Sequence, residues 1–307
     1  MKLFDLFKKK PRFIEEWPIP FKEARPFEEI HVRDPFIVTE KDGYVLTGTI
    51  CNKNISDGYG VPIYKSKDLK TWSGPYMIVE QSKGYEQYSH YWAPEIHKVD
   101  NQYWLLVTLM PEGGKRGTYL FTADKIDGTY TLRARVTPED MFSLDGTYYE
   151  ENGKKYIVYC YEWVEATDGH VRAVELKEDL SGIKLETDRL LFKASSNVFH
   201  PRLSPNKVTD GPFLYKDGGK LKMLWSTGGN RNYLLLNATS TGGLFDKWEQ
   251  ESLLFEDDGG HGMIFTTHEG EKKIVIHAPN GKNEKKGTFE HPVILPFGKP
   301  IAINDKH

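Results

Sequence analysis

The sequence predicts an all-β fold, a five-bladed β-propeller, on the strength of three observations. Short β-hairpins rich in aromatic and β-branched residues recur five times along the 307 residues. The hairpins begin about 50 to 65 residues apart, a period expected when one propeller blade is the repeating unit. Each hairpin opens on an acidic residue or a histidine, and these openers are Asp34, Glu95, Asp145, Asp210 and His261.

The third unit shows the pattern most clearly. Residues 143–149 and 156–163 read as two strands, joined over residues 150–155 by a polar turn that carries Asn-Gly, a strong hairpin signal. Equivalent hairpins are predicted over residues 34–48, 93–108, 210–226 and 261–277. Similar turns occur late in three units, at residues 66–72, 123–130 and 242–248, and they predict further strands outside the hairpins.

The repeat favours one domain that spans residues 1–307. Residues 1–25 are rich in proline and are predicted to be irregular, because a proline biases the residue before it away from helix. This segment is a candidate strand for the last blade. Sharing a sheet between the two termini would close the ring and remove exposed edges.

Composition excludes several function classes. The net charge of −3 gives no electrostatic basis for binding nucleic acid or an acidic membrane, and no apolar run is long enough to span a bilayer. The N-terminus lacks the apolar core of a secretory signal, and Cys51 and Cys160 show no metal-binding spacing. A cytoplasmic protein with buried free thiols is therefore predicted, and its oligomeric state stays open.

The openers are expected to share a pocket, because the first strand of each propeller blade lines the central channel. Four acids and one histidine would then lie at one end of that channel. Paired carboxylates suit glycoside hydrolysis, in which one acid protonates the leaving oxygen and another carboxylate activates water. The sequence contains no motif of a serine or cysteine nucleophile and no phosphate-binding glycine loop.

Five short motifs resemble the blade-opening motifs of glycoside hydrolase family 43 between residues 28 and 280. They are Arg33-Asp34-Pro35-Phe36, Trp92-Ala93-Pro94-Glu95, Leu144-Asp145-Gly146-Thr147, Thr209-Asp210-Gly211-Pro212-Phe213 and Gly260-His261-Gly262-Met263. Each motif is weak alone, but five in the family's order and spacing are specific. The resemblance implies a five-bladed propeller and an inverting mechanism on arabinofuranosyl, xylosyl or galactosyl substrates.

The resemblance also implies roles for three acids. Asp34 matches the general base, and Asp145 matches the acid that orients the general acid and raises its pKa through like-charge proximity. On the fourth blade the family usually has Glu before Gly-Pro, whereas this chain has the shorter Asp210. Asp210 is the first candidate for the general acid, and Glu162, at the end of the second strand of the third hairpin, is the alternative.

Further residues are candidates for substrate binding. Glu95 is expected either to bind a sugar hydroxyl or to be a structural turn acid. Four aromatic residues are candidates either for stacking on sugar rings or for the core: Trp92, Trp72, Phe36 and Trp163. His200 and Arg202, on the long loop before the fourth hairpin, are expected to bind sugar hydroxyls or to face solvent.

Two interpretations of His261 are open. The resemblance implies that it lies beside a water-coordinated cation, commonly Ca²⁺, in the central channel. One histidine is a poor ligand set for a hard cation, so a histidine hydrogen-bonded to water is the alternative. The expected chemistry itself requires no cofactor.

We expect an exo-glycosidase that trims arabinofuranosyl, xylosyl or galactosyl residues from the non-reducing ends of short oligosaccharides. One alternative is a non-catalytic sugar-binding propeller, which the missing fourth-blade glutamate makes plausible. Another is a glycoside phosphorylase of similar fold, although only Arg33 offers a basic group near the acids. An oligosaccharide is the expected partner, with neither nucleic acid nor membrane.

Overall fold

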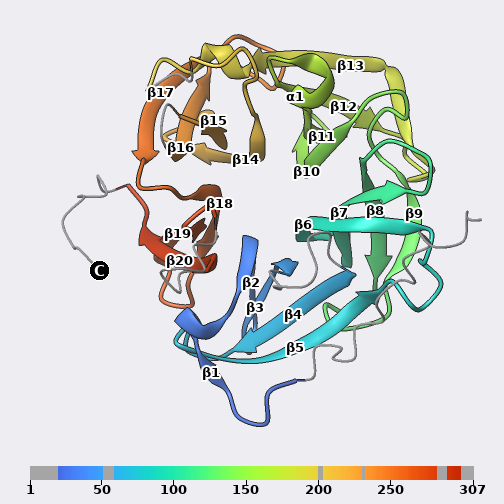
Figure 1. Cartoon of the computed structure of the whole chain (residues 1–307), viewed down its shortest axis with the longest axis vertical. Helices are drawn as coiled ribbons and strands as arrows, with labels where there is room; N and C mark the ends of the chain where they lie inside the picture. Colours follow the sequence, from blue (N-terminus) through green and yellow to red (C-terminus); the bar gives the residue numbers. More distant parts are fainter. Residues whose placement is uncertain (1–19, 51–58, 200–202, 230–231, 282–288, 299–307) are drawn as a thin grey trace, which may run out of the picture.

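The computed structural model of the protein describes residues 20–50, 59–199, 203–229, 232–281 and 289–298. Within these residues the strands form five antiparallel sheets, arranged like blades around a central axis (Figure 1). The predicted all-β, five-bladed propeller is confirmed.

The blades follow one another along the chain. The first contains β1 (Arg25–Pro26), β2 (Val32–Glu40), β3 (Gly43–Ile50), β4 (Gly60–Ser66) and β5 (Thr71–Glu80). The second contains β6 (Tyr88–Val99), β7 (Gln102–Pro111), β8 (Gly117–Ala123) and β9 (Thr131–Arg135). The third contains β10 (Ser143–Glu151), β11 (Lys154–Tyr161), β12 (His170–Leu176) and β13 (Ile183–Lys193). The fourth contains β14 (Asp210–Asp217), β15 (Lys220–Gly228), β16 (Tyr233–Ser240) and β17 (Trp248–Phe255), and the fifth contains β18 (Gly260–Thr266), β19 (Lys272–Ala278) and β20 (His291–Pro296).

Strands run outward from the channel in chain order within each blade, and β1 alone departs from this order among the described strands. The inner strands are therefore β2, β6, β10, β14 and β18, which surround the axis in Figure 1. The three late turns predicted from the sequence join the third and fourth main strands of the first, second and fourth blades. Those predictions are confirmed.

Apolar side chains fill the spaces between neighbouring blades. Within the described residues every one of the five interfaces has a buried cluster, and the one between the third and fourth blades joins Val158 and Cys160 to Met223 and Trp225. Because both faces of a blade are covered, its middle strands are nearly continuous apolar runs, as in β7. This packing fixes the inner strands relative to one another.

The N-terminal segment extends the first blade, not the last one. Arg25 pairs with Trp72, so β1 covers the outer edge of β5, and the last blade has three strands among the described residues. The described part of the predicted segment, residues 20–25, therefore adds no strand to the last blade, and residues 1–19 lie outside the described part. Among the described residues, side chains join the first and last blades, for example the hydroxyl of Thr39, which donates to the carbonyl of Thr266 at 2.6 Å.

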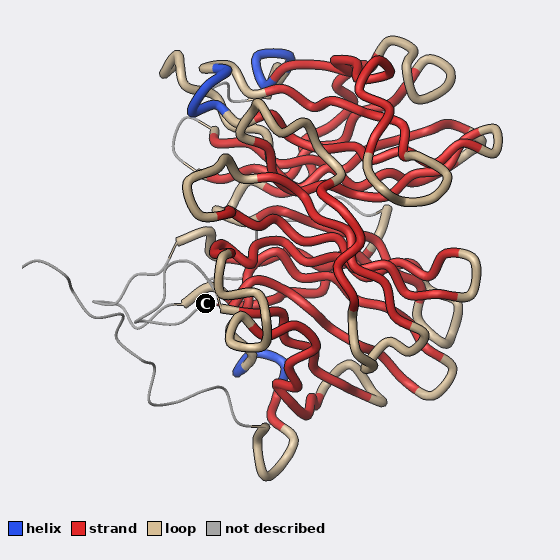
Figure 2. The backbone as a smooth tube through the Cα atoms, turned by 90° about the vertical axis from the view of Figure 1, so that its right-hand side faces the viewer, coloured by secondary structure: helices blue, strands red, loops and turns tan. Residues whose placement is uncertain are grey.

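Helical structure in the described chain is confined to connections between strands (Figure 2). It consists of α1 (Trp163–Ala166) and two 3-10 turns, η1 (Phe27–Glu29) and η2 (Ala194–Ser196). No helix in the described ranges has the length and apolar character needed to cross a membrane.

Candidate active site

The inner strand of every blade contains a β-bulge near its start. In β2 the pairing with β3 shifts between Arg33 and Phe36, and the other inner strands shift at the equivalent place. The first bulged residue has a left-handed backbone in each blade: Asp34 (φ 51°), Ala93 (φ 44°), Asp145 (φ 56°), Gly211 (φ 51°) and His261 (φ 49°). Such a backbone costs a residue other than glycine on the order of 1 kcal/mol or more and is typical of functional sites.

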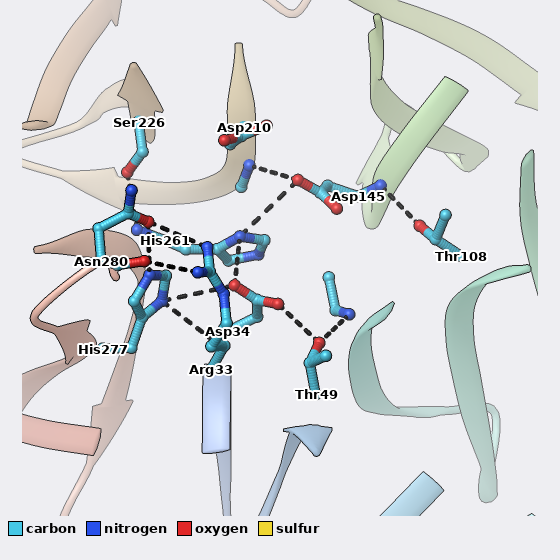
Figure 3. A network of polar contacts seen from close by, with 12 residues as sticks. Arg33, Asp34, Thr49, Thr108, Asp145, Asp210, Ser226, His261, His277 and Asn280 are labelled. Carbon is cyan, nitrogen blue, oxygen red and sulfur yellow. Dashed lines mark hydrogen bonds and ion pairs between the residues drawn. The ribbon is translucent and has the colours of Figure 1, made fainter. Parts of the chain in front are cut away.

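Hydrogen bonds from the bulged residues join each blade to the preceding one. In four pairs a side chain on the second strand of the preceding blade accepts the N–H: Thr49 Oγ1 from Ala93 (2.7 Å), Thr108 Oγ1 from Asp145 (2.9 Å), Ser226 Oγ from His261 (2.7 Å) and His277 Nδ1 from Asp34 (3.1 Å). In the fifth pair the N–H of Gly211 donates to Asp145 Oδ2 at 3.1 Å. These bonds bring three predicted site residues, Asp34, Asp145 and His261, into one network (Figure 3).

Asp34 is held in its ionised form. The hydroxyl of Thr49 donates to Oδ2 at 2.6 Å, and Oδ1 lies 3.2 Å from Nδ1 of His261. Burial alone would raise the pKa of Asp34, but the positive charges of His261 and Arg33 and the Thr49 hydrogen bond lower it to about 2. Asp34 is therefore a carboxylate at any physiological pH.

His277 supports Asp34 as a neutral ring. Burial and the neighbouring charge of Arg33 lower the pKa of His277 to about 3. Because Nδ1 accepts the Asp34 N–H, the proton of the ring is on Nε2, 3.1 Å from Asn280 Oδ1. Arg33 donates to the carbonyl and the side chain of Asn280 at 2.6 and 2.9 Å, so two of its N–H groups are already engaged beside His277.

Asp145 is buried and Asp210 is partly buried, and ionising both carboxyls together is costly. Burial raises the pKa of Asp145 well above its usual value, and the negative charges of Asp210 and Asp34 add to this effect. Burial likewise raises the pKa of Asp210 to about 6, although its Oδ2 accepts a hydrogen bond from the Tyr233 hydroxyl at 3.0 Å. The pair can therefore retain one proton at mildly acidic pH.

His261 lies between the acids. Burial would lower its pKa, but the charges of Asp34, Asp145 and Asp210 raise it, and Nδ1 is 3.2 Å from Asp34 and 3.7 Å from Asp145. Gly211 packs against the ring so closely that a Cβ there would lie 2.7 Å from the imidazole. A raised pKa disfavours the neutral ring that a metal ligand needs, so His261 is poorly suited to direct coordination of Ca²⁺, and no group of three His, Cys, Asp or Glu side chains in the described residues could hold a metal ion. The predicted water-coordinated cation beside His261 stays a prediction.

Comparison with known proteins assigns this geometry to a family. The chain matches the family described as "Glycosyl hydrolases family 43" over residues 24–298. The chain belongs to this family. The resemblance seen in the blade-opening motifs is thereby confirmed.

Individual relatives of this family 43 chain have several activities in their names. The chain is 34% identical to the endo-arabinase from Bacteroides thetaiotaomicron VPI-5482, with a TM-score of 0.76 over 91% of this chain and 97% of that one. It is 23% identical to alpha-L-arabinofuranosidase 43 of Humicola insolens over 83% of this chain and 56% of that protein. It is 24% identical to the beta-xylosidase of Bacillus subtilis (strain 168) over 80% of this chain and 48% of that protein. The chain thus spans about half the length of these two curated relatives.

Glu162, the alternative general acid in this family 43 chain, is held in a buried ion pair. Its Oε1 and Oε2 accept hydrogen bonds from Nε and Nη2 of Arg116 at 2.8 and 2.6 Å. The guanidinium also lies over the rings of Trp92 and Phe142, 5.2 and 5.1 Å from their centroids. Protonating Glu162 would break a charge-assisted bidentate pair, so the geometry disfavours Glu162 as a proton donor.

Two of the four candidate stacking aromatics are core residues. Trp72 is fully buried in β5 and stacks on Phe27, with ring centroids 5.4 Å apart. Phe36 is buried in the channel against His97 and Phe213. For these two residues the structure supports the core alternative over stacking on a sugar ring.

The other predicted binding residues differ in their exposure. Trp92 is half-buried next to the bulge of β6, and Trp163 is 38% exposed on α1, so both stay predicted platforms. Glu95 is buried beyond the bulge, and its Oε2 lies 2.7 Å from Nε2 of His97, which supports its structural reading over sugar binding. His200 and Arg202 lie outside the described residues.

Sequence reasoning missed the side chains that support the acids: Thr49, Thr108, Ser226, His277 and Tyr233. The first four occupy the same place in their blades, opposite the residue that precedes the bulge. A polar residue that recurs near the end of an otherwise apolar second strand was the available signal. Tyr233 on β16 had no comparable signal.

Proposed function

We propose that the protein is an inverting glycoside hydrolase that releases arabinofuranosyl residues from short oligosaccharides. One observation carries this proposal: an ionised carboxylate, Asp34, and a carboxyl group with a raised pKa, Asp210, surround the same buried histidine. Two titratable groups whose environments move their pKa values apart suit the base and the acid of a hydrolase. The family supports the same class of reaction.

The proposed reaction is a single displacement. Asp34 takes a proton from a water molecule, whose oxygen attacks the anomeric carbon from the face opposite the leaving group. The bond between this carbon and the glycosidic oxygen breaks, and Asp210 gives its proton to that oxygen. Asp34 then loses its proton and Asp210 regains one before the next cycle.

Asp145 and His261 support these two groups without exchanging bonds with the sugar. The charge of His261 keeps Asp34 ionised, so the base is ready at neutral pH. Asp145 is hydrogen-bonded to the residue that follows Asp210, and because the two carboxyl groups oppose each other's ionisation, the pair retains a proton. The Tyr233 hydroxyl orients the Asp210 carboxyl through Oδ2.

The value of kcat/KM is expected to fall as the pH rises through about 6. Asp210 can act as an acid only while it is protonated, and its pKa of about 6 places the loss of that proton there. Asp34, with a pKa of about 2, stays ionised throughout and contributes no decline near neutrality. A kcat/KM profile from about pH 4 to about pH 9 tests this expectation, and a constant value up to about pH 8 would contradict it.

Two further properties are proposed: specificity for arabinofuranosyl substrates, and release of one sugar at a time. The choice of arabinofuranosyl substrates rests on the endo-arabinase that is 34% identical to this chain, since the names of the other similar proteins include both arabinofuranosidases and xylosidases. These names also include both an endo-arabinase and an exo-arabinofuranosidase. Aryl glycosides of arabinofuranose, xylose, galactose and galactofuranose separate the sugars. Chromatography of the products from linear arabino-oligosaccharides separates the two modes, since an exo-enzyme yields only monosaccharide at early times.

The first sugar released is expected to have the inverted anomeric configuration. Inversion follows if Asp34 activates water and does not itself attack carbon. Proton NMR spectra recorded during the first minutes of hydrolysis show the configuration before the anomers equilibrate. Retention would exclude the proposed roles of Asp34 and Asp210 together.

A non-catalytic sugar-binding propeller is the second candidate, because Asp210 is shorter than the glutamate usual in the family. In that case a sugar would raise the melting temperature of the protein and stay intact during long incubation. The cytoplasmic location remains a prediction, which cell fractionation tests.

A further inference from the structure

Four of the five hydrogen bonds between blades share one pattern. In these four the accepting residue lies opposite the residue that precedes the bulge of its own blade, as Thr49 does opposite Arg33 and Thr108 does opposite Trp92. In the third blade this place belongs to Cys160, opposite Leu144. A residue here would be expected to accept the N–H of Gly211, the bulged residue of the fourth blade.

Cys160 faces the correct interface for that bond. Its side chain is fully buried in the cluster between the third and fourth blades, together with Met223 and Trp225. Asp145 and Asp210 are near enough for their charges to raise the pKa of the thiol, to which burial contributes most, so the group stays a neutral thiol. A neutral thiol is a weak hydrogen-bond acceptor compared with the hydroxyls of threonine and serine.

The Gly211 N–H therefore goes to a different acceptor. It donates to Asp145 Oδ2 at 3.1 Å, and Asp145 is the bulged residue of the blade that carries Cys160. A backbone N–H is a strong donor, and a buried one is costly to leave unpaired. A carboxylate is the stronger acceptor of the two that the third blade presents.

We propose that Cys160 is a positioning residue, which leaves the Gly211 N–H free for Asp145 and so ties that carboxylate to the strand that carries Asp210. The effect of this hydrogen bond on catalysis rests on the proposed function. It assigns Cys160 no contact with the substrate and no reaction of its sulfur. It explains why the repeat of hydroxyl and imidazole acceptors is interrupted at the blade that precedes the general acid.

A hydroxyl acceptor at residue 160 should therefore weaken the hydrogen bond between Gly211 and Asp145 and lower activity. In Cys160→Ser or Cys160→Thr the new hydroxyl would accept the Gly211 N–H, as in the first, second and fourth blades. Asp145 would lose a hydrogen bond that favours its charged form, and the proton shared by Asp145 and Asp210 would shift towards Asp145. Cys160→Ala, which adds no acceptor, leaves the Gly211 bond with Asp145 and is the matched control for the loss of the thiol.

Two measurements test the proposal. In protein labelled with ¹⁵N-glycine, the amide signal of Gly211 should follow the ionisation of Asp145 in the wild type and in Cys160→Ala, but not in the serine and threonine variants. On a glycoside with a poor leaving group, kcat/KM of Cys160→Ser should be roughly tenfold below that of Cys160→Ala, with its basic limb moved to higher pH.

Failure of the inference about Cys160 can be distinguished from failure of the proposed function. A Gly211 signal that titrates alike in Cys160→Ser and Cys160→Ala overturns the inference, whether or not the protein hydrolyses any sugar. Equal pH profiles of kcat/KM in these two variants overturn it as well. If the wild type hydrolyses no glycoside, the proposed function fails, while the NMR comparison still decides whether Cys160 directs the Gly211 amide.

Discussion

Replacing Asp34 with asparagine is expected to lower kcat by roughly 10²- to 10⁴-fold, the range typical of a lost general base, while substrate binding survives. An amide cannot take a proton from water. Asparagine tolerates the left-handed backbone of residue 34 (φ 51°) better than most residues and can still accept the hydrogen bond from Thr49. The loss should therefore be chemical and not structural. Steady-state kinetics with an aryl glycoside measures kcat, and calorimetric titration with the product sugar measures binding.

Asp42→Asn is the matched control for this change. Asp42 is an exposed aspartate in the turn between β2 and β3, in the same blade as Asp34. Its replacement removes the same charge without touching the channel and should leave kcat unchanged. Near-normal turnover by Asp34→Asn would remove Asp34 from the mechanism, and equal losses in both variants would point to a general effect of charge on the blade.

The fold could be predicted because each blade repeats the same physical pattern. A hairpin with two apolar faces needs neighbours on both sides, and five such hairpins at one period leave few arrangements other than a closed ring. The convergence of Asp34, Asp145 and His261 follows from the same reasoning, since equivalent strand positions in a ring face one axis. Asp210 lies one residue before the position that Asp34, Asp145 and His261 occupy in their strands, because Gly211 is the bulged residue of the fourth blade.

The errors arose where side-chain environment decides function. Trp72 and Trp163 look alike in the sequence, yet Trp72 is buried in β5, beneath β1, with its indole N–H donating to the carbonyl of Leu69, and Trp163 lies exposed on α1. The partner of Glu162 is Arg116 on another blade, a pairing that no local pattern indicates. The destination of residues 20–26 also depended on a contact, with the edge of β5, that composition does not specify.

The supporting side chains form an intermediate case. Thr49, Thr108, Ser226 and His277 recur at one place of the repeat, so an alignment of the five hairpins could have found them. Their role depends on the bulge, because only the shift in pairing turns the next blade's N–H towards them. Bulges of this kind have no sequence signature beyond the Asp-Pro, Ala-Pro, Asp-Gly, Gly-Pro and His-Gly pairs that they contain here.

Glu162→Gln is expected to lower activity about equally on substrates with good and poor leaving groups. The change weakens a bidentate pair with Arg116, whose guanidinium lies over Phe142 and over Trp92, a predicted sugar platform. Loss of a hydrogen bond between charged groups should also destabilise the protein by about 1.5 to 3 kcal/mol, which a lower melting temperature would show. An effect on orientation of this kind does not depend on the leaving group.

Asp210→Asn is expected to abolish most hydrolysis of a disaccharide, by roughly 10²-fold or more, yet to spare a dinitrophenyl glycoside of the same sugar. A general acid matters in proportion to the need of the leaving oxygen for a proton, and dinitrophenolate leaves without one. The same variant should lose the decline of kcat/KM above about pH 6 on the activated substrate, because the group with that pKa is gone. If Glu162→Gln showed this selectivity instead, Glu162 would be the acid despite its pair with Arg116. If both variants lost activity equally on the two substrates, neither residue would donate the proton, and the single displacement proposed for Asp34 and Asp210 would be wrong.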